Sequence, residues 1–200
     1  MARLTFFLLA AGCVLAQTPK NGLYAIFNTS QGNITARLYE KDTPVTVENF
    51  VALAQGAKAT RDPKTGAMLK VRLYDNITFH RVLPGVMIQS GDPTGTGSHN
   101  CGFTIRDEIL PGLRFDSGGK LAMANTGAPD SGGCQFFITT SPMRQWDGKY
   151  TMFGVVVDGQ DVVEKINHAD VHGDKPVNPV KLISVTIERI GPEPRKKNKR

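Results

Sequence analysis

The sequence predicts a mainly β domain, a barrel or a sandwich, that also contains two helices. Short apolar and β-branched runs recur along the chain, and loops rich in Gly, Pro, Asp and Asn separate them. Two further segments carry apolar residues at helical spacing. Many short strands between turn signals are typical of all-β barrels and sandwiches.

The size and charge of the chain indicate one domain without a nucleic-acid partner. The chain has 200 residues, of which 40% are hydrophobic and 21% charged, enough for one core. Five basic residues between Arg195 and Arg200, together with Arg3, account for the whole net charge of +6. The neutral body disfavours a groove for phosphates. Binding of nucleic acid or an anionic surface through the tail is the alternative.

The first sixteen residues predict a secretory signal peptide. Arg3 precedes an apolar run from Leu4 to Leu15, and Ala16 occupies a small-residue cleavage position. The run is too short to span a bilayer of about 30 Å. We therefore expect an exported protein, periplasmic or secreted, with an N-terminal extension at 17–22. Lipid attachment at Cys13, which would anchor the mature chain to a membrane, is the second-ranked alternative.

Cleavage of the signal peptide would leave two cysteines, Cys101 and Cys134. An even number of cysteines in an exported chain favours a disulfide. Two unpaired thiols, with Cys134 half-buried before a strand, remain an alternative. The histidines are scattered and no Cys-x-x-Cys motif occurs, so we expect no metal and no cofactor.

The first third of the chain predicts a hairpin, a helix and a surface excursion. Residues 23–39 form two apolar runs around a turn at 30–32. Thr43 as N-cap and a proline after it predict a helix that stops at Gly56. Residues 57–72 are polar and contain a turn, which indicates the excursion. The buried face of the helix is expected to hold Val47, Phe50, Val51 and Ala54.

The rest of the chain predicts further strands and a second helix. The helix is expected to start after Gly159 and to bury Val162, Val163 and Ile166. Alternation of Ile183, Val185 and Ile187 with polar residues predicts a closing strand. The strands between are expected at Ile77–Val82, Val86–Gln89, Lys120–Ala124, Gln135–Thr139 and Met152–Val157.

Alternation within these strands points to a binding site. Successive side chains of a strand face opposite sides, so Met87 shares a face with Gln89, and Gln135 shares a face with Phe137. Arg81 lies on the face opposite the core residues that flank it. If the three strands are neighbours, their mixed faces form an apolar floor beneath one guanidinium. That combination is typical of a ligand site.

Five sequence blocks, in order, resemble the cyclophilin family of peptidyl-prolyl cis-trans isomerases. They are Phe79-His80-Arg81-Val82-Leu83-Pro84-Gly85, Gln89-Ser90-Gly91-Asp92, Met123-Ala124-Asn125, Gln135-Phe136-Phe137-Ile138 and Asp147-Gly148-Lys149-Tyr150-Thr151-Met152-Phe153-Gly154. The resemblance covers residues 23–190, is most like bacterial members, and leaves 191–200 as a disordered basic tail. It implies a closed eight-stranded antiparallel β-barrel capped by two α-helices, with a substrate groove on the outer wall.

The implied reaction needs no cofactor. Rotation about an X-Pro bond is opposed by about 20 kcal/mol of amide resonance, and no bond is made or broken. A permanently charged guanidinium can donate a hydrogen bond to the proline nitrogen of the twisted state, and we assign this role to Arg81. The resemblance implies that Gln89 holds Arg81, that Asn125 binds the substrate backbone and that Gln135 orients a substrate carbonyl. The other implied binding residues are Val86, Met87, Ala124, Thr126, Phe137, Trp146 and Tyr150.

Three departures from the family pattern affect specificity. Val86 replaces a common aromatic residue, Gln145-Trp146 replaces an aromatic-Leu pair, and Tyr150 replaces a frequent His. We therefore expect reduced affinity for cyclosporin-type inhibitors. Separately, we expect a monomer that acts on proline-containing polypeptides. A proline-peptide binding module or chaperone with negligible turnover is the alternative function.

The resemblance also places the two cysteines beside the groove. Cys134 directly precedes Gln135, and Cys101 lies in the glycine-rich loop that borders the same groove. The resulting hypothesis is a disulfide that fixes this loop beside the pocket for residues upstream of proline.

Overall fold

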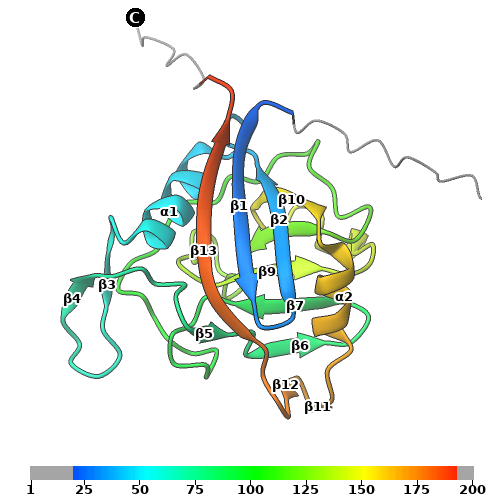
Figure 1. Ribbon diagram of the computed structural model, residues 1–200. Helices are drawn as coiled ribbons and strands as arrows, with labels where there is room; N and C mark the ends of the chain where they lie inside the picture. The colour runs from blue at the N-terminus through cyan, green and yellow to red at the C-terminus, as the bar shows by residue number, and fades with distance from the viewer. Residues whose placement is uncertain (1–19, 193–200) are drawn as a thin grey trace, which may run out of the picture.

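One curled nine-stranded sheet, two short ribbons and two α-helices make up the fold (Figure 1). The structure is a computed structural model that describes residues 20–192. The expected signal peptide at 1–16 and residues 193–200 of the expected tail lie outside the described residues. Within 20–192, no helix is long and apolar enough to cross a membrane.

The sheet has the strand order β5-β13-β1-β2-β10-β8-β9-β7-β6. In Figure 1, β13, β1 and β2 stand in front, while β9, β7 and β6 cross behind them. The ribbons are β3-β4 and β11-β12. The strands are β1 Gly22–Thr29, β2 Gly32–Leu38, β3 Ala59–Arg61, β4 Met68–Lys70, β5 Ile77–Thr78, β6 Arg81–Leu83, β7 Met87–Ser90, β8 Lys120–Met123, β9 Phe136–Thr139, β10 Met152–Asp158, β11 Val171–His172, β12 Lys175–Pro176 and β13 Lys181–Ile190.

The expectation of a closed eight-stranded barrel is wrong in both closure and strand count. The strand expected at 77–82 is interrupted at Phe79 and His80, so it supplies β5 at one edge and β6 at the other. The backbone N–H of Phe79 donates to Val180, while that of Val82 donates to Asp174, at 3.0 and 2.8 Å. Because β5 pairs with β13 while β6 pairs with β7, the two parts of this segment lie at opposite edges of the sheet, which is an open half-barrel of nine strands.

A core of aromatic rings fills the inner face of the sheet beneath helix α1, Pro44–Gln55. Phe50 is fully buried, and its ring lies 5.1 Å from Tyr74 and Phe153, 5.7 Å from Phe136 and 5.9 Å from Phe27, measured between centroids. Helix α1 contacts β13, whereas α2 contacts β2, β6 and β7. The two helices therefore cover different ends of the half-barrel (Figure 1).

Helix α1 has its expected limits but a different N-terminal cap. Gly56 ends the helix in the left-handed region, with φ of 72°. Thr43 makes no side-chain cap hydrogen bond. Instead the carboxylate of Glu108 accepts from the backbone N–H groups of Val45 and Thr46 at 3.1 and 2.8 Å. A charged acceptor at a helix N-terminus satisfies the same unpaired donors.

Residues 57–72 form the expected excursion, and the ribbon β3-β4 flanks the expected turn within it. One further expectation needs correction. In β13, a register shift opposite Asn28 and Thr29 changes the alternation, so Ile183 is 45% exposed while Val185 is buried. Helix α2, Gln160–Asn167, follows Gly159 as predicted, with Val163 and Ile166 buried and Val162 only partly so.

Candidate active site

A row of five side chains crosses the outer face of the sheet. Paired registers place Arg81 opposite Gln89, Gln89 opposite Phe137, Phe137 opposite Ala122, and Ala122 opposite Met152. The row therefore runs from β6 through β7, β9 and β8 to β10. Directly opposite residues in antiparallel strands have Cβ atoms about 5 Å apart. The expected sharing of faces by Arg81, Gln89 and Phe137 is confirmed.

The apolar part of this row belongs to an outer cluster, separate from the inner core. Its buried members are Met87, Phe115, Ala122, Phe137, Met143 and Met152. Around them, Val86, Ala124, Trp146 and Tyr150 are only partly buried. Because its rim is partly exposed, the cluster offers an apolar surface to a ligand. Four of the expected pocket residues form its rim.

Aromatic rings surround Phe137 in this cluster. Its centroid lies 5.3 Å from that of Trp146 and 5.2 Å from that of Tyr150, with interplanar angles of 80° and 84°. Trp146 belongs to the 3-10 helix Arg144–Trp146, and Phe115 stacks on Phe137 at 6.1 Å. Edge-to-face rings at these distances pack favourably. The cluster therefore has rigid walls.

Two acceptors hold the guanidinium of Arg81 at the edge of this cluster. Nη1 donates to Gln89 Oε1 at 3.2 Å, and Nε donates to Asp174 Oδ2 at 2.7 Å. The side chain of Arg81 is 42% exposed. A guanidinium has five N–H donors, so three remain beyond these two bonds. The sequence predicted Gln89 as a partner and missed Asp174.

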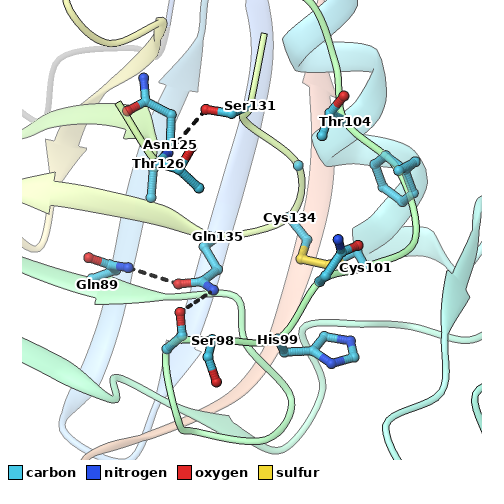
Figure 2. A pocket seen from close by; sticks show the side chains of 15 residues that line it. Gln89, Ser98, His99, Cys101, Thr104, Asn125, Thr126, Ser131, Cys134 and Gln135 are labelled. Carbon is cyan, nitrogen blue, oxygen red and sulfur yellow. Dashed lines mark hydrogen bonds between the residues drawn. A yellow bond between two sulfur atoms is a disulfide. The ribbon is translucent and has the colours of Figure 1, made fainter. Parts of the chain in front are cut away.

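A hollow adjoins the row at Gln89. Gln89 Nε2 donates to Gln135 Oε1 at 2.8 Å, and Gln135 Nε2 donates to the carbonyl of Gly97 at 3.0 Å. Figure 2 shows these two glutamines facing each other in the hollow. The cavity measures about 390 Å³, and Ala124, Asn125, Thr126, Cys101 and Cys134 are among its other lining residues.

Cys101 and Cys134 are joined by a disulfide beside Gln135 (Figure 2). Their Cα atoms lie 6.3 Å apart, within the usual span for such a bond. Both residues are buried. The bond connects the segment before β9 to the loop over 92–105. The alternative of two unpaired thiols is wrong for this structure.

The side-chain amide of Asn125 makes hydrogen bonds within the chain. Nδ2 donates to the carbonyl of Lys149 at 2.9 Å, and Oδ1 accepts from the N–H of Gly127 at 3.1 Å. The side chain thereby fixes the segment after β8, while Thr126 is exposed at the cavity. The role expected for Asn125, through its main chain, is compatible with this arrangement.

Asp92 organises the glycine-rich loop on the far side of the cavity. Its buried carboxylate accepts from the N–H groups of Thr94, Gly97 and His99 at 2.6, 2.7 and 3.2 Å. Burial alone would raise the pKa of Asp92, but these hydrogen bonds outweigh it and lower the pKa. The ionised carboxylate therefore holds the loop that receives the hydrogen bond of Gln135.

His80 lies buried behind the row, next to Arg81 in the chain. Neither ring nitrogen has a hydrogen-bond partner, and a side chain at Gly97 would come within 3.5 Å of the ring. Burial lowers the pKa of His80, although the negative charge of Asp92 acts in the opposite direction. The imidazole is therefore neutral near pH 7, as a structural residue requires.

Several residues of the site gave no signal in the sequence. Phe115, Met143 and Asp174 lie in loops or a turn, where no periodicity marks a face. Met152 begins an expected strand, but only the register of β10 shows that it belongs to the outer cluster. Within residues 20–192, no group of three or more His, Cys, Asp or Glu is placed to hold a metal ion.

The chain belongs to the family of cyclophilin-type peptidyl-prolyl cis-trans isomerases. The model of that family, described as "Cyclophilin type peptidyl-prolyl cis-trans isomerase/CLD", matches residues 24–187. The match contains the whole row and the cavity beside it. The chain accordingly has the function of the family, isomerisation of X-Pro peptide bonds.

Curated relatives from bacteria and fungi support this assignment. Peptidyl-prolyl cis-trans isomerase B of Streptomyces anulatus is 43% identical over 170 residues, which cover 83% of this chain and 97% of the relative. Peptidyl-prolyl cis-trans isomerase-like 1 of Aspergillus fumigatus is 40% identical over 172 residues, which cover 84% and 97%. Peptidyl-prolyl cis-trans isomerase A of Mycobacterium tuberculosis is 43% identical over 166 residues, which cover 82% and 91%.

A solved structure has the same fold. The cyclophilin-type isomerase of Cryptosporidium parvum, crystallised in the presence of the dipeptide Ala-Pro, has a TM-score of 0.73 and 30% identity. The similarity covers 84% of this chain and 99% of that one. The open half-barrel described above is therefore a cyclophilin fold.

The buried His80 predicts an acid-sensitive fold. The unfolded chain binds a proton near pH 6.5, whereas the folded chain binds it only at lower pH. The contribution of neutral His80 to the free energy of unfolding is therefore fully present above about pH 6.5. It is lost as the pH drops below this value, by at most about 1.4 kcal/mol per pH unit for one proton. His80→Leu should flatten this slope in urea unfolding between about pH 6.5 and 5. Exposed His172→Gln is the control, and equal slopes in wild type and His80→Leu would contradict the prediction.

Proposed function

We propose that this isomerase acts on exported proline-containing polypeptides, and that Arg81 is its catalytic residue. The observation that carries the assignment is a cation held by two acceptors on the same sheet face as an apolar cluster with a partly exposed rim. The site therefore matches an X-Pro bond, which combines an apolar proline ring with a polar amide. Binding a ring alone would not require a fixed guanidinium.

The outer cluster would lower the barrier by holding the proline ring. The planar amide is more polar than the twisted one, because its nitrogen lone pair is delocalised onto the carbonyl. When the ring lies on Phe137 and Met87, water is excluded from the planar state. The twisted nitrogen regains its lone pair, and one of the remaining N–H groups of Arg81 can donate to it. The donor is in place before rotation, so little reorganisation accompanies it.

The cavity beside Gln135 would receive the residues that precede proline. No Asp, Glu, Lys or Arg lines the cavity, so it offers hydrogen bonds rather than a fixed charge. Gln135 keeps one amide hydrogen beyond its two bonds, because its NH₂ group has only two donors and one goes to Gly97. The Cryptosporidium parvum relative was studied with Ala-Pro, which supports a proline-containing substrate here. We further propose a monomer with reduced affinity for cyclosporin-type inhibitors.

Replacing the guanidinium tests the proposed mechanism. Arg81→Ala should lower kcat for cis-trans exchange of an Ala-Pro peptide by about a hundredfold to a thousandfold, the usual cost of one transition-state donor. KM should change little, because the apolar cluster is intact. The measurement is exchange spectroscopy by NMR at several peptide concentrations.

Two controls accompany this measurement. Arg72→Ala removes another half-exposed arginine, paired with Asp75 at 2.9 Å, and should leave kcat unchanged. Arg81→Lys retains the positive charge but lacks the planar set of N–H donors of a guanidinium, so it should recover only part of the rate. If wild type and Arg81→Ala both bind the peptide and neither broadens its lines, the chain is a binding module instead.

The disulfide is proposed to fix the loop over 92–105 beside the cavity. The double variant Cys101→Ser/Cys134→Ser should lose about 2–4 kcal/mol of unfolding free energy, since the bond closes a sequence separation of 33 residues. KM should rise for peptides with two or more residues before proline, and should stay constant for Ala-Pro dipeptide. Equal KM changes for both lengths would show that the bond serves stability alone.

Export is proposed from the apolar N-terminal run and Ala16. The intact mass of protein recovered from outside the cytoplasm should correspond to a chain beginning at Gln17. A mass that retains Cys13 with an acyl modification would select the membrane-anchored form, and an unprocessed chain would refute both.

A further inference from the structure

The active-site arginine has an acidic partner that lies far away in the chain. Asp174 belongs to the two-residue turn between β11 and β12, where Gly173 adopts a φ of 68°. Its carboxylate accepts from Arg81 Nε at 2.7 Å, the shorter of the two contacts made by this guanidinium. Charge-assisted hydrogen bonds are stronger than neutral ones. The carboxylate is therefore the principal restraint on the position of Arg81.

The backbone holds Asp174 in place for this contact. Its carbonyl accepts from the N–H of Val82 at 2.8 Å, so the turn is tied to the residue that follows Arg81. The ribbon itself is closed by the pairing of His172 with Lys175 and by a hydrogen bond from the N–H of Val177 to the carbonyl of Asp170. The carboxylate thus approaches Arg81 from a fixed base rather than from a free loop.

The two acceptors bind different N–H groups of the guanidinium. Asp174 occupies Nε and Gln89 occupies one hydrogen of Nη1, which leaves the second hydrogen of Nη1 and both hydrogens of Nη2. With only Gln89, the planar group could swing about its long side chain. With both acceptors, its plane and its direction are set. Rotamer freedom that is removed before the substrate binds need not be lost during the reaction.

The carboxylate restrains Arg81 without cancelling its charge. The side chains of Arg81 and Asp174 are 42% and 49% exposed, so water screens their attraction. The hydrogen bond from Arg81 lowers the pKa of Asp174, which keeps the carboxylate ionised in neutral solution. The cation can therefore still act on the proline nitrogen.

We propose that Asp174 is a positioning residue of this isomerase, which aims the guanidinium of Arg81 across the sheet edge through the β11-β12 turn. The proposal rests on the catalytic role of Arg81 given above. It assigns Asp174 no contact with the substrate.

Removal of the carboxylate should affect turnover more than binding. Asp174→Ala should lower kcat about fivefold, the factor that corresponds to about 1 kcal/mol for a half-exposed ion pair, with KM nearly unchanged. Asp174→Asn keeps an oxygen acceptor for Nε and should restore most of the rate. Asp170→Asn, an exposed acid at the base of the same ribbon, is the matched charge control and should retain the wild-type rate.

Two further measurements separate positioning from a merely structural role. The ¹⁵N relaxation of Arg81 Nε should show greater motion in Asp174→Ala than in wild type or Asp174→Asn. In the Arg81→Ala background, Asp174→Ala should have no further effect on kcat, because Asp174 acts through Arg81. A fivefold loss that persists in this background, an unchanged kcat, or an equal loss in the Asn and Ala variants would each overturn the proposal.

The same set of variants distinguishes this proposal from the function on which it rests. If Arg81→Ala retains full exchange activity, the catalytic assignment of Arg81 fails. If Arg81→Ala is inactive while Asp174→Ala matches wild type in kcat and in Nε relaxation, only the role of Asp174 fails.

Discussion

The register of five antiparallel strands is the constraint on which the site depends. The ladders β6-β7, β7-β9, β9-β8 and β8-β10 place Arg81, Gln89, Phe137, Ala122 and Met152 in one line. Between these residues along each strand, the side chains enter the inner core, as Ile88 and Ile138 do. A slip of one residue would exchange the two faces and bury the guanidinium in the core. Burial on both faces therefore specifies the register, and the register assembles the site.

A chain of polar contacts then crosses the row from loop to loop. It starts at Asp174, passes through Arg81, Gln89 and Gln135, and ends at the carbonyl of Gly97. Each member is held by its neighbour, so the one cation is fixed from both sides. The loop at the far end is held in turn by the buried carboxylate of Asp92. Rigid positioning matters for this reaction, because a donor aimed at a twisting amide is useful only in the direction of the developing lone pair.

The sequence predicted what depends on local pattern and missed what depends on distant pairing. Alternation identified the shared faces of Arg81, Gln89 and Phe137, and helical spacing gave both helices. It could not show that the strand is interrupted at Phe79 and His80, because the backbone N–H groups of Phe79 and Val82 donate to segments about a hundred residues away. Alternation also grouped Ile183 with Val185 and Ile187 on one face, because a bulge leaves no signature in the pattern of apolar residues. No sequence feature distinguishes Asp174 from other acidic residues in turns, and only the packing of the β11-β12 ribbon brings it to Arg81.

The side chains of the row make the chemistry of the site independent of pH in mild acid, whereas the stability of the fold depends on pH. The row consists of one guanidinium, a permanently charged group, and four side chains without an ionisable group. Of the nearby groups with lowered pKa values, Asp174 contacts Arg81 directly, whereas His80 and Asp92 act through the fold. Mild acid would thus leave the chemistry of the row unchanged as long as the chain stays folded. Loss of activity on acidification should therefore follow the unfolding of the chain rather than the titration of its catalytic group.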